Sequence, residues 1–510
     1  MNPLSNAGLP MDRNRVPAPS SNMLQAPSAA NASQITETCR SAGYLAPKLE
    51  ELFGFSIPPP HHHPQAADFA AATPVNSAFT ALARLFFLGL PVEEKDLRSF
   101  FPQEFVNACF ACGLIDNANG IVTAQALLIP VDQWYLTSDV HPTNIHYGEH
   151  YVPTLSQPAM HLFSFAIKKA VGSTLDLCGG CGPHAMAASR FSETVMTADS
   201  NYRAAEFVDF NAALNGFTNI EAVTGDLFLP VKGRTFDLIL CNPPFVISPS
   251  TSSGFRDNEF ELDFFLEKIL REVPDHLAPG GFFQTTCEWV QVQGEEWQER
   301  LDGWLQNNGC DAWILEANCQ LPESYARNRL RETSPSDNTD VTSLENYLHY
   351  FNERNVEAIR GGLIFLHKRE GPNWRDFSNL REGVRQPIGE AVLQGFMNRD
   401  LIHSTKFRDS IMKSRLVICK GIQQHEHSHW DGVNWTTDAI RLQNGAGIPC
   451  EVVIDKQVRS LLNEFTGSRT VTEILQQFSD KHGMSRENAE SRGIDLIRLM
   501  LEQGIITLMP

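Results

Sequence analysis

The stretch TLDLCGGCGPHA, residues 174–185, decides the fold class of this chain. Its first residues predict a buried strand that contains Asp176, and the glycines 179, 180 and 182 predict a turn that leads into a helix. Small residues at such a turn allow the backbone to approach a ligand closely. Many nucleotide-binding α/β folds share a glycine-rich turn, so this stretch needs support from the rest of the sequence.

Three further strands with polar ends follow the glycine turn. Residues 194–199 predict a strand that ends in Asp199, 23 residues after Asp176. A carboxylate at the tip of the second strand can accept hydrogen bonds from both hydroxyls of a ribose. Strands are also predicted at 220–223, before Asp226 and Leu227, and at 236–241, before Asn242-Pro243-Pro244-Phe245. Together these segments predict a parallel sheet whose carboxyl ends form the site.

The Asn-Pro-Pro-Phe segment suits chemistry on a planar nitrogen. The lone pair of an amide or nucleobase amino nitrogen is delocalised, which makes the nitrogen a poor nucleophile. Hydrogen bonds from its N–H groups to the side-chain oxygen of Asn242 and the carbonyl of Pro243 would orient this lone pair. Pro243 and Pro244 stiffen the backbone, and Phe245 offers a flat face for the substrate group. Such catalysis needs no metal and no covalent nucleophile.

In order and spacing, these motifs resemble class I S-adenosylmethionine-dependent methyltransferases of the Asn-Pro-Pro-aromatic branch. That branch includes release-factor glutamine-N5, ribosomal RNA guanine-N2 and nucleic-acid adenine-N6 methyltransferases. The resemblance covers roughly residues 140–370. It implies an α/β fold with a Rossmann-like, seven-stranded sheet, and S-adenosyl-L-methionine as the cofactor.

The resemblance also assigns roles to individual residues. It implies that Asp176 and the turn from Cys178 to Gly182, with Gly179 and Gly180, hold the methionine part of the cofactor. Asp199, together with Ser200, would bind the ribose, and Asp226 and Leu227 would meet the adenine. The family has glycine where this chain has Cys178. Since cysteine favours ordinary backbone angles, we expect a slightly altered turn there. Asn242, Pro243, Pro244 and Phe245 would be the catalytic residues, with Asn242 also near the cofactor.

Composition and apolar periodicity predict further parts on both sides of this domain. We expect a disordered tail and a Pro/His-rich linker over 1–64, because residues 1–33 have few aromatic or β-branched side chains. Apolar spacing predicts a helical, winged-helix-like domain at 65–140 before the methyltransferase domain at 141–370. Residues 371–447 are expected to form an irregular linker, and 448–510 a small, mainly helical, winged-helix-like module.

Length and charge narrow the environment and the partners. The 510 residues carry a net charge of −19, contain 11 cysteines and lack an apolar run long enough to cross a bilayer. We therefore expect a cytoplasmic protein with free thiols and no membrane contact. Residues 171–330 contain 23 acidic side chains against 10 Lys and Arg, which disfavours non-specific binding of nucleic acid.

Several alternatives stay open at this level. The methyl acceptor can be a protein glutamine, a nucleobase or a small metabolite, and oligomerisation is possible. A non-catalytic, cofactor-binding scaffold is the competing function, whereas a nicotinamide-dependent dehydrogenase would leave Asn-Pro-Pro-Phe unexplained. His425, His427 and His429 could share one face of a strand, but their polar surroundings favour a solvated loop. We assign no metal site.

Overall fold

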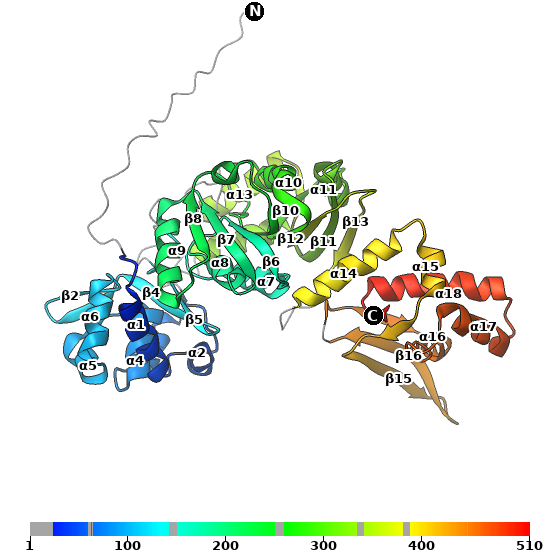
Figure 1. Cartoon of the computed structure of the whole chain (residues 1–510), viewed down its shortest axis with the longest axis horizontal. Helices are drawn as coiled ribbons and strands as arrows, with labels where there is room; N and C mark the ends of the chain where they lie inside the picture. Colours follow the sequence, from blue (N-terminus) through cyan, green and yellow to red (C-terminus); the bar gives the residue numbers. More distant parts are fainter. Residues whose placement is uncertain are drawn as a thin grey trace, which may run out of the picture. The chain divides into compact units, whose positions relative to one another are not determined.

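The computed structural model describes residues 24–59, 63, 65–141, 150–249, 260–333, 341–380, 388–445 and 447–509. These residues divide into two compact units (Figure 1). The N-terminal unit comprises the described residues within 1–58, 67–140 and 213–216. The larger unit contains the rest.

The N-terminal unit combines helices with short strands. After two N-terminal helices come α3 (Ala66–Ala72), α4 (Ala78–Leu82), a π-helical turn (Ala83–Phe87), α5 (Glu94–Phe100) and α6 (Gln103–Ala111). Strands β1 (Val92–Glu93), β3 (Ile121–Ala124) and β2 (Ile115–Ala118) form one small sheet, and β4 (Ala126–Val131) pairs with β5 (Trp134–Asp139). The segment thus contains helices followed by short strands, and its winged-helix-like character stays a prediction.

The expectation of a disordered tail is wrong for residues 24–53, and residues 1–23 lie outside the described chain. Helices α1 (Ala29–Ser41) and α2 (Ala46–Phe53) form there, with a serine side chain capping the first turn of α1. Ile35, Cys39 and Leu49 are fully buried. The Tyr44 hydroxyl donates a hydrogen bond to the carbonyl of Leu128, 2.7 Å away. These buried side chains and this hydrogen bond hold the segment in the N-terminal unit.

An eight-stranded mixed sheet forms the centre of the larger unit, in the order β13-β11-β12-β10-β9-β6-β7-β8. Strands β6 to β10 run parallel, β12 is antiparallel to its two neighbours, and β13 is parallel to β11. The strands are β6 (Val171–Leu177), β7 (Ser192–Asp199), β8 (Ile220–Thr224), β9 (Phe236–Cys241), β10 (Leu277–Val292), β11 (Cys310–Gln320), β12 (Val356–Lys368) and β13 (Arg375–Asn379). The predicted strands are all present. The expected count of seven is wrong, because β13 adds an edge strand from the supposed linker.

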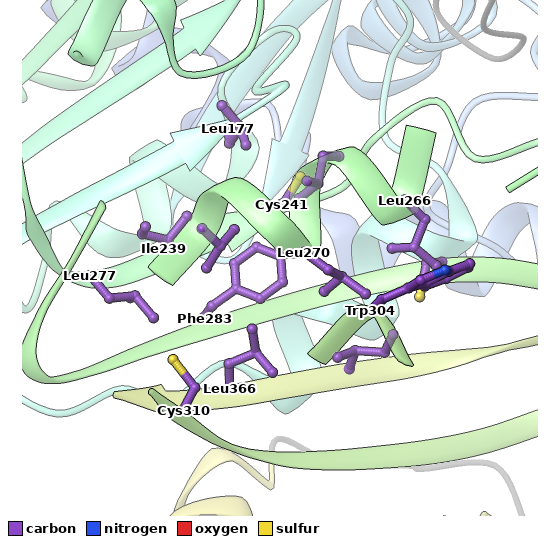
Figure 2. Close-up of a cluster of buried hydrophobic side chains, with 14 of the residues drawn as sticks. Leu177, Ile239, Cys241, Leu266, Leu270, Leu277, Phe283, Trp304, Cys310 and Leu366 are labelled. Carbon is purple, nitrogen blue, oxygen red and sulfur yellow. The ribbon is translucent and has the colours of Figure 1, made fainter. Parts of the chain in front are cut away.

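Helices cover both faces of this sheet, and alternate residues of its strands point to opposite cores. On one face Ile239, Phe283 and Leu366 pack against α10 (Phe264–His276) and α11 (Trp297–Leu305) (Figure 2). On the other face the neighbouring residues Leu240, Phe282 and Phe365 pack against α7 (Gln157–Phe165) and α14 (Gly389–Ile402). Burial on both faces explains why the strands are continuous apolar runs in the sequence.

The irregular linker expected at 371–447 is also wrong, because most of its described residues form helices and strands. Helix α14 packs Val392 and Phe396 on the sheet, and Gly395 lies so close to the Trp313 ring that a Cβ atom would clash. Further along are α15 (Phe407–Lys413), β14 (Leu416–Ile418), β15 (Ile422–Trp430) and β16 (Trp435–Asn444). Their buried side chains join one core with the C-terminal helices.

The C-terminal module therefore begins near Ile402 rather than at residue 448. Its C-terminal part contains α16 (Lys456–Leu462), α17 (Val471–His482), α18 (Arg486–Glu502) and the short strand β18 (Ile506–Leu508). However, β18 pairs with β14, and β17 (Glu451–Ile454) joins β15 and β16 in a three-stranded sheet. Its core thus depends on residues that precede the predicted boundary, and the winged-helix comparison stays a prediction.

His425, His427 and His429 lie on strand β15 rather than in a loop. All three are exposed, and the Nδ1 atom of His429 lies 2.7 Å from a carboxylate oxygen of Asp438. Their polar neighbours gave no strand signal, because both faces of this strand contact solvent along most of its length. Among the described residues, no helix is both long and apolar enough to cross a membrane.

We predict that Ile35→Ala destabilises the N-terminal unit, because it removes a fully buried side chain from α1. The expected loss is about 2–4 kcal/mol in the free energy of unfolding. Glu37→Ala, on the exposed side of the same helix, is the control and should change it little. Urea unfolding followed by hydrogen exchange of the α1 peptide measures both. Equal effects of the two substitutions would show that α1 does not pack on this unit.

Candidate functional site

The parallel strands bring the predicted site residues to one edge of the sheet. Asp176 lies in β6 beside Thr197 of β7 and Leu240 of β9. Asp199 ends β7, and Asn242 directly follows β9. The structure thus places the glycine turn, Asp199 and the Asn-Pro-Pro-Phe segment at the carboxyl ends of neighbouring strands, where open α/β sheets bind ligands.

Cys178 keeps the glycine-like backbone that the sequence analysis did not expect. Its φ is +56°, in the left-handed region, so the turn is not altered towards ordinary angles. Leu227 is also left-handed, with φ of +43°. Such angles are uncommon for residues other than glycine and cluster at functional sites. A hydrogen bond with Cys241 and burial raise the pKa of the Cys178 thiol, so this group stays protonated.

Gly179 is required by the space around it. A Cβ atom on Gly179 would lie 2.1 Å from Oγ1 of Thr197 and 3.0 Å from Oδ2 of Asp176. Gly182 has a φ of +82° and precedes helix α8 (Pro183–Ala188). The backbone of this turn therefore packs directly on β6 and β7. A side chain at position 179 would push the turn away from these two strands.

Asp176 is a fully buried carboxyl group with one unsatisfied oxygen. Its Oδ2 atom accepts a hydrogen bond from the backbone N–H of Ala185 at 3.0 Å, and Oδ1 has no partner among the described residues. Burial raises the pKa of Asp176 to about 8. A buried acceptor without a donor costs free energy, and a bound cationic group would both satisfy it and favour the charged form. The site therefore fits a ligand with an ammonium group.

Asp199 is held by the backbone. Its two carboxylate oxygens accept hydrogen bonds from the N–H groups of Gly180 and Asn201, each at 2.9 Å. Burial raises the pKa of Asp199, and the bonds from Asn201, Gly180 and the exposed Ser200 oppose that rise. The carboxylate thus links the end of β7 to the glycine turn, and its remaining lone pairs can accept further donors.

Asp226 and Leu227 follow β8 and differ in exposure. Leu227 is buried, whereas the Asp226 carboxylate is more than half exposed and lies 3.3 Å from the Lys268 ammonium. An exposed pair of this kind contributes little to stability. The two residues thus present one apolar and one charged group at the carboxyl end of β8, beside β7.

Sequence reasoning missed Thr286, which contacts the predicted catalytic asparagine. Its hydroxyl donates a hydrogen bond to the side-chain oxygen of Asn242 at 2.9 Å. Asn242, Pro244 and Phe245 are half-buried and Pro243 is buried. The available signal was the alternation of polar residues in the otherwise apolar stretch 282–290.

His184, in the first turn of α8, is buried with both ring nitrogens unpartnered, and burial lowers its pKa to about 4.

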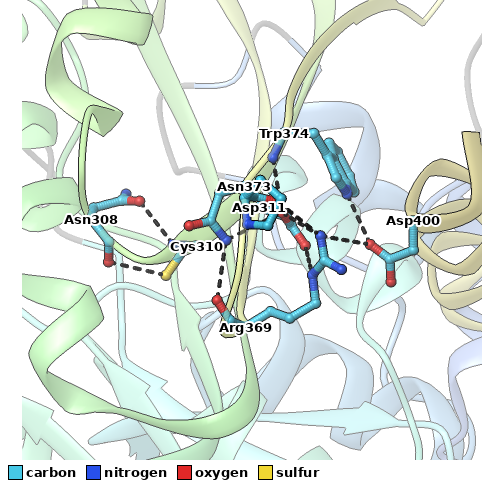
Figure 3. A network of polar contacts seen from close by, with 8 residues as sticks. Asn308, Cys310, Asp311, Arg369, Asn373, Trp374 and Asp400 are labelled. Carbon is cyan, nitrogen blue, oxygen red and sulfur yellow. Dashed lines mark hydrogen bonds and ion pairs between the residues drawn. The ribbon is translucent and has the colours of Figure 1, made fainter. Parts of the chain in front are cut away.

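A second cluster of titratable groups lies at the start of β11. Asp311, His367 and Asp400 offer three possible metal ligands. However, Figure 3 shows that the guanidinium of Arg369 already lies between the two carboxylates, with Nε 2.6 Å from Asp311. Asp311 also accepts a hydrogen bond from the N–H of Trp374 at 2.9 Å. Since one guanidinium already pairs with both carboxylates, the cluster is explained as a structural link between β11, β12 and α14.

Residues 158–288, which include the glycine turn and Asn-Pro-Pro-Phe, match the family model described as "Methyltransferase small domain". The chain carries a methyltransferase small domain. The match confirms the resemblance that the motifs gave, and this domain is of a kind that uses S-adenosyl-L-methionine. The individual site residues stay predictions.

Curated relatives agree with this assignment. A ribosomal protein uL3 glutamine methyltransferase from Xanthomonas campestris is 32% identical over 24% of this chain and 42% of that protein. One from Bradyrhizobium diazoefficiens is 35% identical over 29% of this chain and 52% of that protein. The chain thus spans about half the length of these relatives. Among solved structures, a ribosomal RNA methylase from Streptococcus thermophilus is 15% identical, with a TM-score of 0.25, over 43% of this chain and 100% of that one.

We predict that burial of Asp176 makes the ligand-free protein less stable as the pH rises. Its folded pKa of about 8 lies above the ordinary 3.8, so the folded state holds a proton that the unfolded chain has already released. Between pH 5 and 8 the wild type should lose ~1–3 kcal/mol more than Asp176→Asn, which has no such proton. Urea unfolding at both pH values measures this, with the exposed Asp116→Asn as the control. Parallel pH profiles of wild type and Asp176→Asn would contradict the prediction.

Proposed function

We propose that this protein is an S-adenosylmethionine-dependent N-methyltransferase whose acceptor is the side-chain amide of a protein glutamine. The observation that carries the proposal is the position of Asn242. Its side-chain oxygen lies at the carboxyl end of β9, beside the strand that leads to the glycine turn. An oxygen held there can accept the N–H of a planar amide and so direct the nitrogen lone pair.

The cofactor part of the proposal follows from the donors and acceptors at the sheet edge. The unpartnered oxygen of Asp176 would receive the ammonium group of the cofactor, and the turn from Cys178 to Gly182 would pack against its methionine part. Asp199, with Ser200, would accept the ribose hydroxyls, and Asp226 and Leu227 would border the adenine. When bound, the cofactor supplies an electrophilic methyl group with a thioether as leaving group.

The chain's own residues would then act by alignment. Asn242 and the carbonyl of Pro243 would accept the N–H groups of the acceptor, while Phe245 would lie against its planar face. Pro243 and Pro244 restrict the backbone, so little conformational freedom is lost when the acceptor binds. Positioning of this kind can lower the activation barrier by several kcal/mol without any acid, base or covalent group.

Two observations favour a protein amide over a nucleobase. The domain core from 171 to 330 has 13 more acidic than basic residues, which repels a polyphosphate backbone. In addition, relatives such as those from Xanthomonas campestris and Bradyrhizobium diazoefficiens are named as glutamine methyltransferases. The scaffold alternative, in which the cofactor is bound but no methyl group is transferred, is an outcome of the test below.

We predict that Asn242→Ala lowers the rate of methyl transfer by about 100-fold, because it removes the oxygen that accepts the N–H of the acceptor, and leaves cofactor affinity within about threefold, because Asp176 and Asp199 remain. Asp199→Ala should instead weaken cofactor binding by at least about tenfold. The assay incubates each variant with methyl-labelled S-adenosylmethionine and cell extract. Label is then separated into nucleic acid, protein and small-molecule fractions, and mass spectrometry locates a methyl group on glutamine. Calorimetry measures cofactor affinity.

Asn379→Ala, an exposed asparagine at the end of β13, is the matched control and should keep full activity. If nuclease treatment releases the label, the acceptor is a nucleobase and not a protein glutamine. Cofactor binding without label in any fraction, and with no difference between wild type and Asn242→Ala, would favour the scaffold. Absence of cofactor binding would overturn the proposal.

A further inference from the structure

A stripe of buried polar side chains lies on one face of β10. Gln284, Thr286 and Glu288 alternate along the strand and are 0%, 5% and 6% exposed. Alternate residues of a strand point to the same face. Gln284 bonds to the backbone of Phe165 and Ile167 at the end of α7. Burial of polar groups costs free energy unless each is hydrogen-bonded, so the partners of the other two residues explain why they are polar.

Thr286 holds the start of the segment that follows β9. Its hydroxyl donates to the side-chain oxygen of Asn242. This bond orients the amide, because a donated hydrogen favours the oxygen rather than the NH2 group on that side. The second lone pair of the same oxygen is then available to an acceptor N–H.

Glu288 holds the other end of this segment through a tyrosine of helix α12 (Pro322–Thr333), which belongs to the helical insertion between β11 and β12. The Tyr325 hydroxyl donates to Oε2 of Glu288 at 2.5 Å and accepts the backbone N–H of Ile247 at 3.0 Å. Arg329 pairs with the other oxygen of Glu288. Burial raises the pKa of Glu288, and Arg329 and Tyr325 oppose the rise. The contacts form one chain of hydrogen bonds, in which each bond polarises the next.

The insertion surrounds this chain with apolar contacts. Ile247, Tyr325 and Phe351 belong to one buried cluster formed by α12, α13 (Val341–Glu353) and the segment after Asn-Pro-Pro-Phe. The Tyr325 ring packs edge-on against Phe351, with 6.0 Å between ring centroids. Tyr347 of α13 also donates to the Ser248 hydroxyl, 3.0 Å away. The two helices thus fix the backbone just beyond Phe245.

We propose that Thr286, Glu288 and Tyr325 are positioning residues that fix the segment from Asn242 to Ile247 at both ends. The proposal rests on the proposed function, because it makes this segment the rigid wall of the acceptor site. Fixing both ends keeps the oxygen of Asn242 and the ring of Phe245 in one arrangement before the acceptor binds. Small displacements of positioned groups cost large factors in rate. We call Thr286, Glu288 and Tyr325 the clamp, and we expect it to affect methyl transfer rather than cofactor binding.

Tyr325→Phe tests the clamp, because it deletes only the hydroxyl and keeps the ring contacts. Tyr350→Phe is the matched control in the same insertion. The Tyr350 hydroxyl accepts the backbone N–H of Leu262 at 2.9 Å, so each substitution leaves one backbone N–H without its acceptor. Leu262 lies outside the segment from Asn242 to Ile247. Hydrogen exchange, cofactor calorimetry and the labelled-cofactor assay with cell extract are measured on wild type and both variants.

We expect Tyr325→Phe to lower the maximal rate of transfer by about tenfold or more and to change cofactor affinity by less than about twofold. Amide exchange at residues 246–248 should become about tenfold faster or more. Tyr350→Phe should keep the transfer rate and accelerate exchange only near Leu262. Thr286→Val, which removes the hydroxyl at the other end, should lower the transfer rate with the same unchanged cofactor affinity.

Each outcome separates the clamp from the proposed function. Faster exchange at 246–248 with an unchanged transfer rate in Tyr325→Phe would overturn the positioning role and leave the proposed function intact. Equal loss of transfer in Tyr350→Phe would mean that the insertion acts through general stability, which also overturns it. A wild type that binds cofactor but transfers no label would overturn the proposed function. In that case unchanged exchange in Tyr325→Phe would show that the clamp itself is wrong.

Discussion

The pairing of β6 with β7 on one side and β9 on the other is the constraint on which the rest of the site depends. Leu177 lies beside Ala198 and Cys241, so the residues that follow these three positions must meet at one edge. Cys178, Asp199 and Asn242 occupy those positions. A shift of one residue in either pairing would turn Asp176 to the opposite face of the sheet. The register of the backbone hydrogen bonds thus brings these three positions together, and side-chain bonds such as that from Thr286 to Asn242 then fix the local arrangement.

The same edge concentrates conformational and electrostatic costs. Cys178 and Leu227 adopt left-handed backbone angles, and each costs on the order of 1–3 kcal/mol. Within the described part of the chain, Asp176 has a buried oxygen without a donor, and His184 has two buried nitrogens without partners. In the turn, Gly179 packs so closely on Thr197 that a Cβ atom there would clash, so the flanking strands restrict the conformation of the turn. A ligand that donates to Asp176 would recover part of this free energy on binding.

The parallel strands β6, β7, β8 and β9 could be predicted because apolar residues in each are followed by a polar or glycine residue, whereas β13 has few apolar residues and was missed. Residues such as Asp199 and Asn242 could be predicted for the same reason, since their places at strand ends need no tertiary information. Helix α14 could not be predicted as readily, because its packing depends on Gly395 fitting against Trp313, a contact between distant parts of the sequence. Strand β15 was missed because its exposed residues carry no apolar alternation.

The positioning residues illustrate a further limit of the sequence. Tyr325 can be identified only once α12 is placed against β10, although the polar alternation of Gln284, Thr286 and Glu288 was visible in the sequence. The functional meaning of that alternation depends on the partners that the fold supplies. A stripe of this kind within a buried strand indicates that hydrogen-bonded neighbours exist, but not where they lie in the sequence.

The buried pair of Glu288 and Arg329 is poor evidence for stability, because apolar side chains of similar size often stabilise a core as well or better. Val290, on the same face of β10, packs in the apolar cluster that contains Ile247, Tyr325 and Phe351. An apolar residue at 288 could fill the same space, but it could not accept the hydrogen of Tyr325. Without that acceptor the hydroxyl hydrogen could rotate towards the N–H of Ile247 and weaken the bond that the oxygen accepts from it. The carboxylate is therefore explained by the direction it gives to one hydrogen bond, and Arg329 by the charge that must be balanced once the carboxylate is buried.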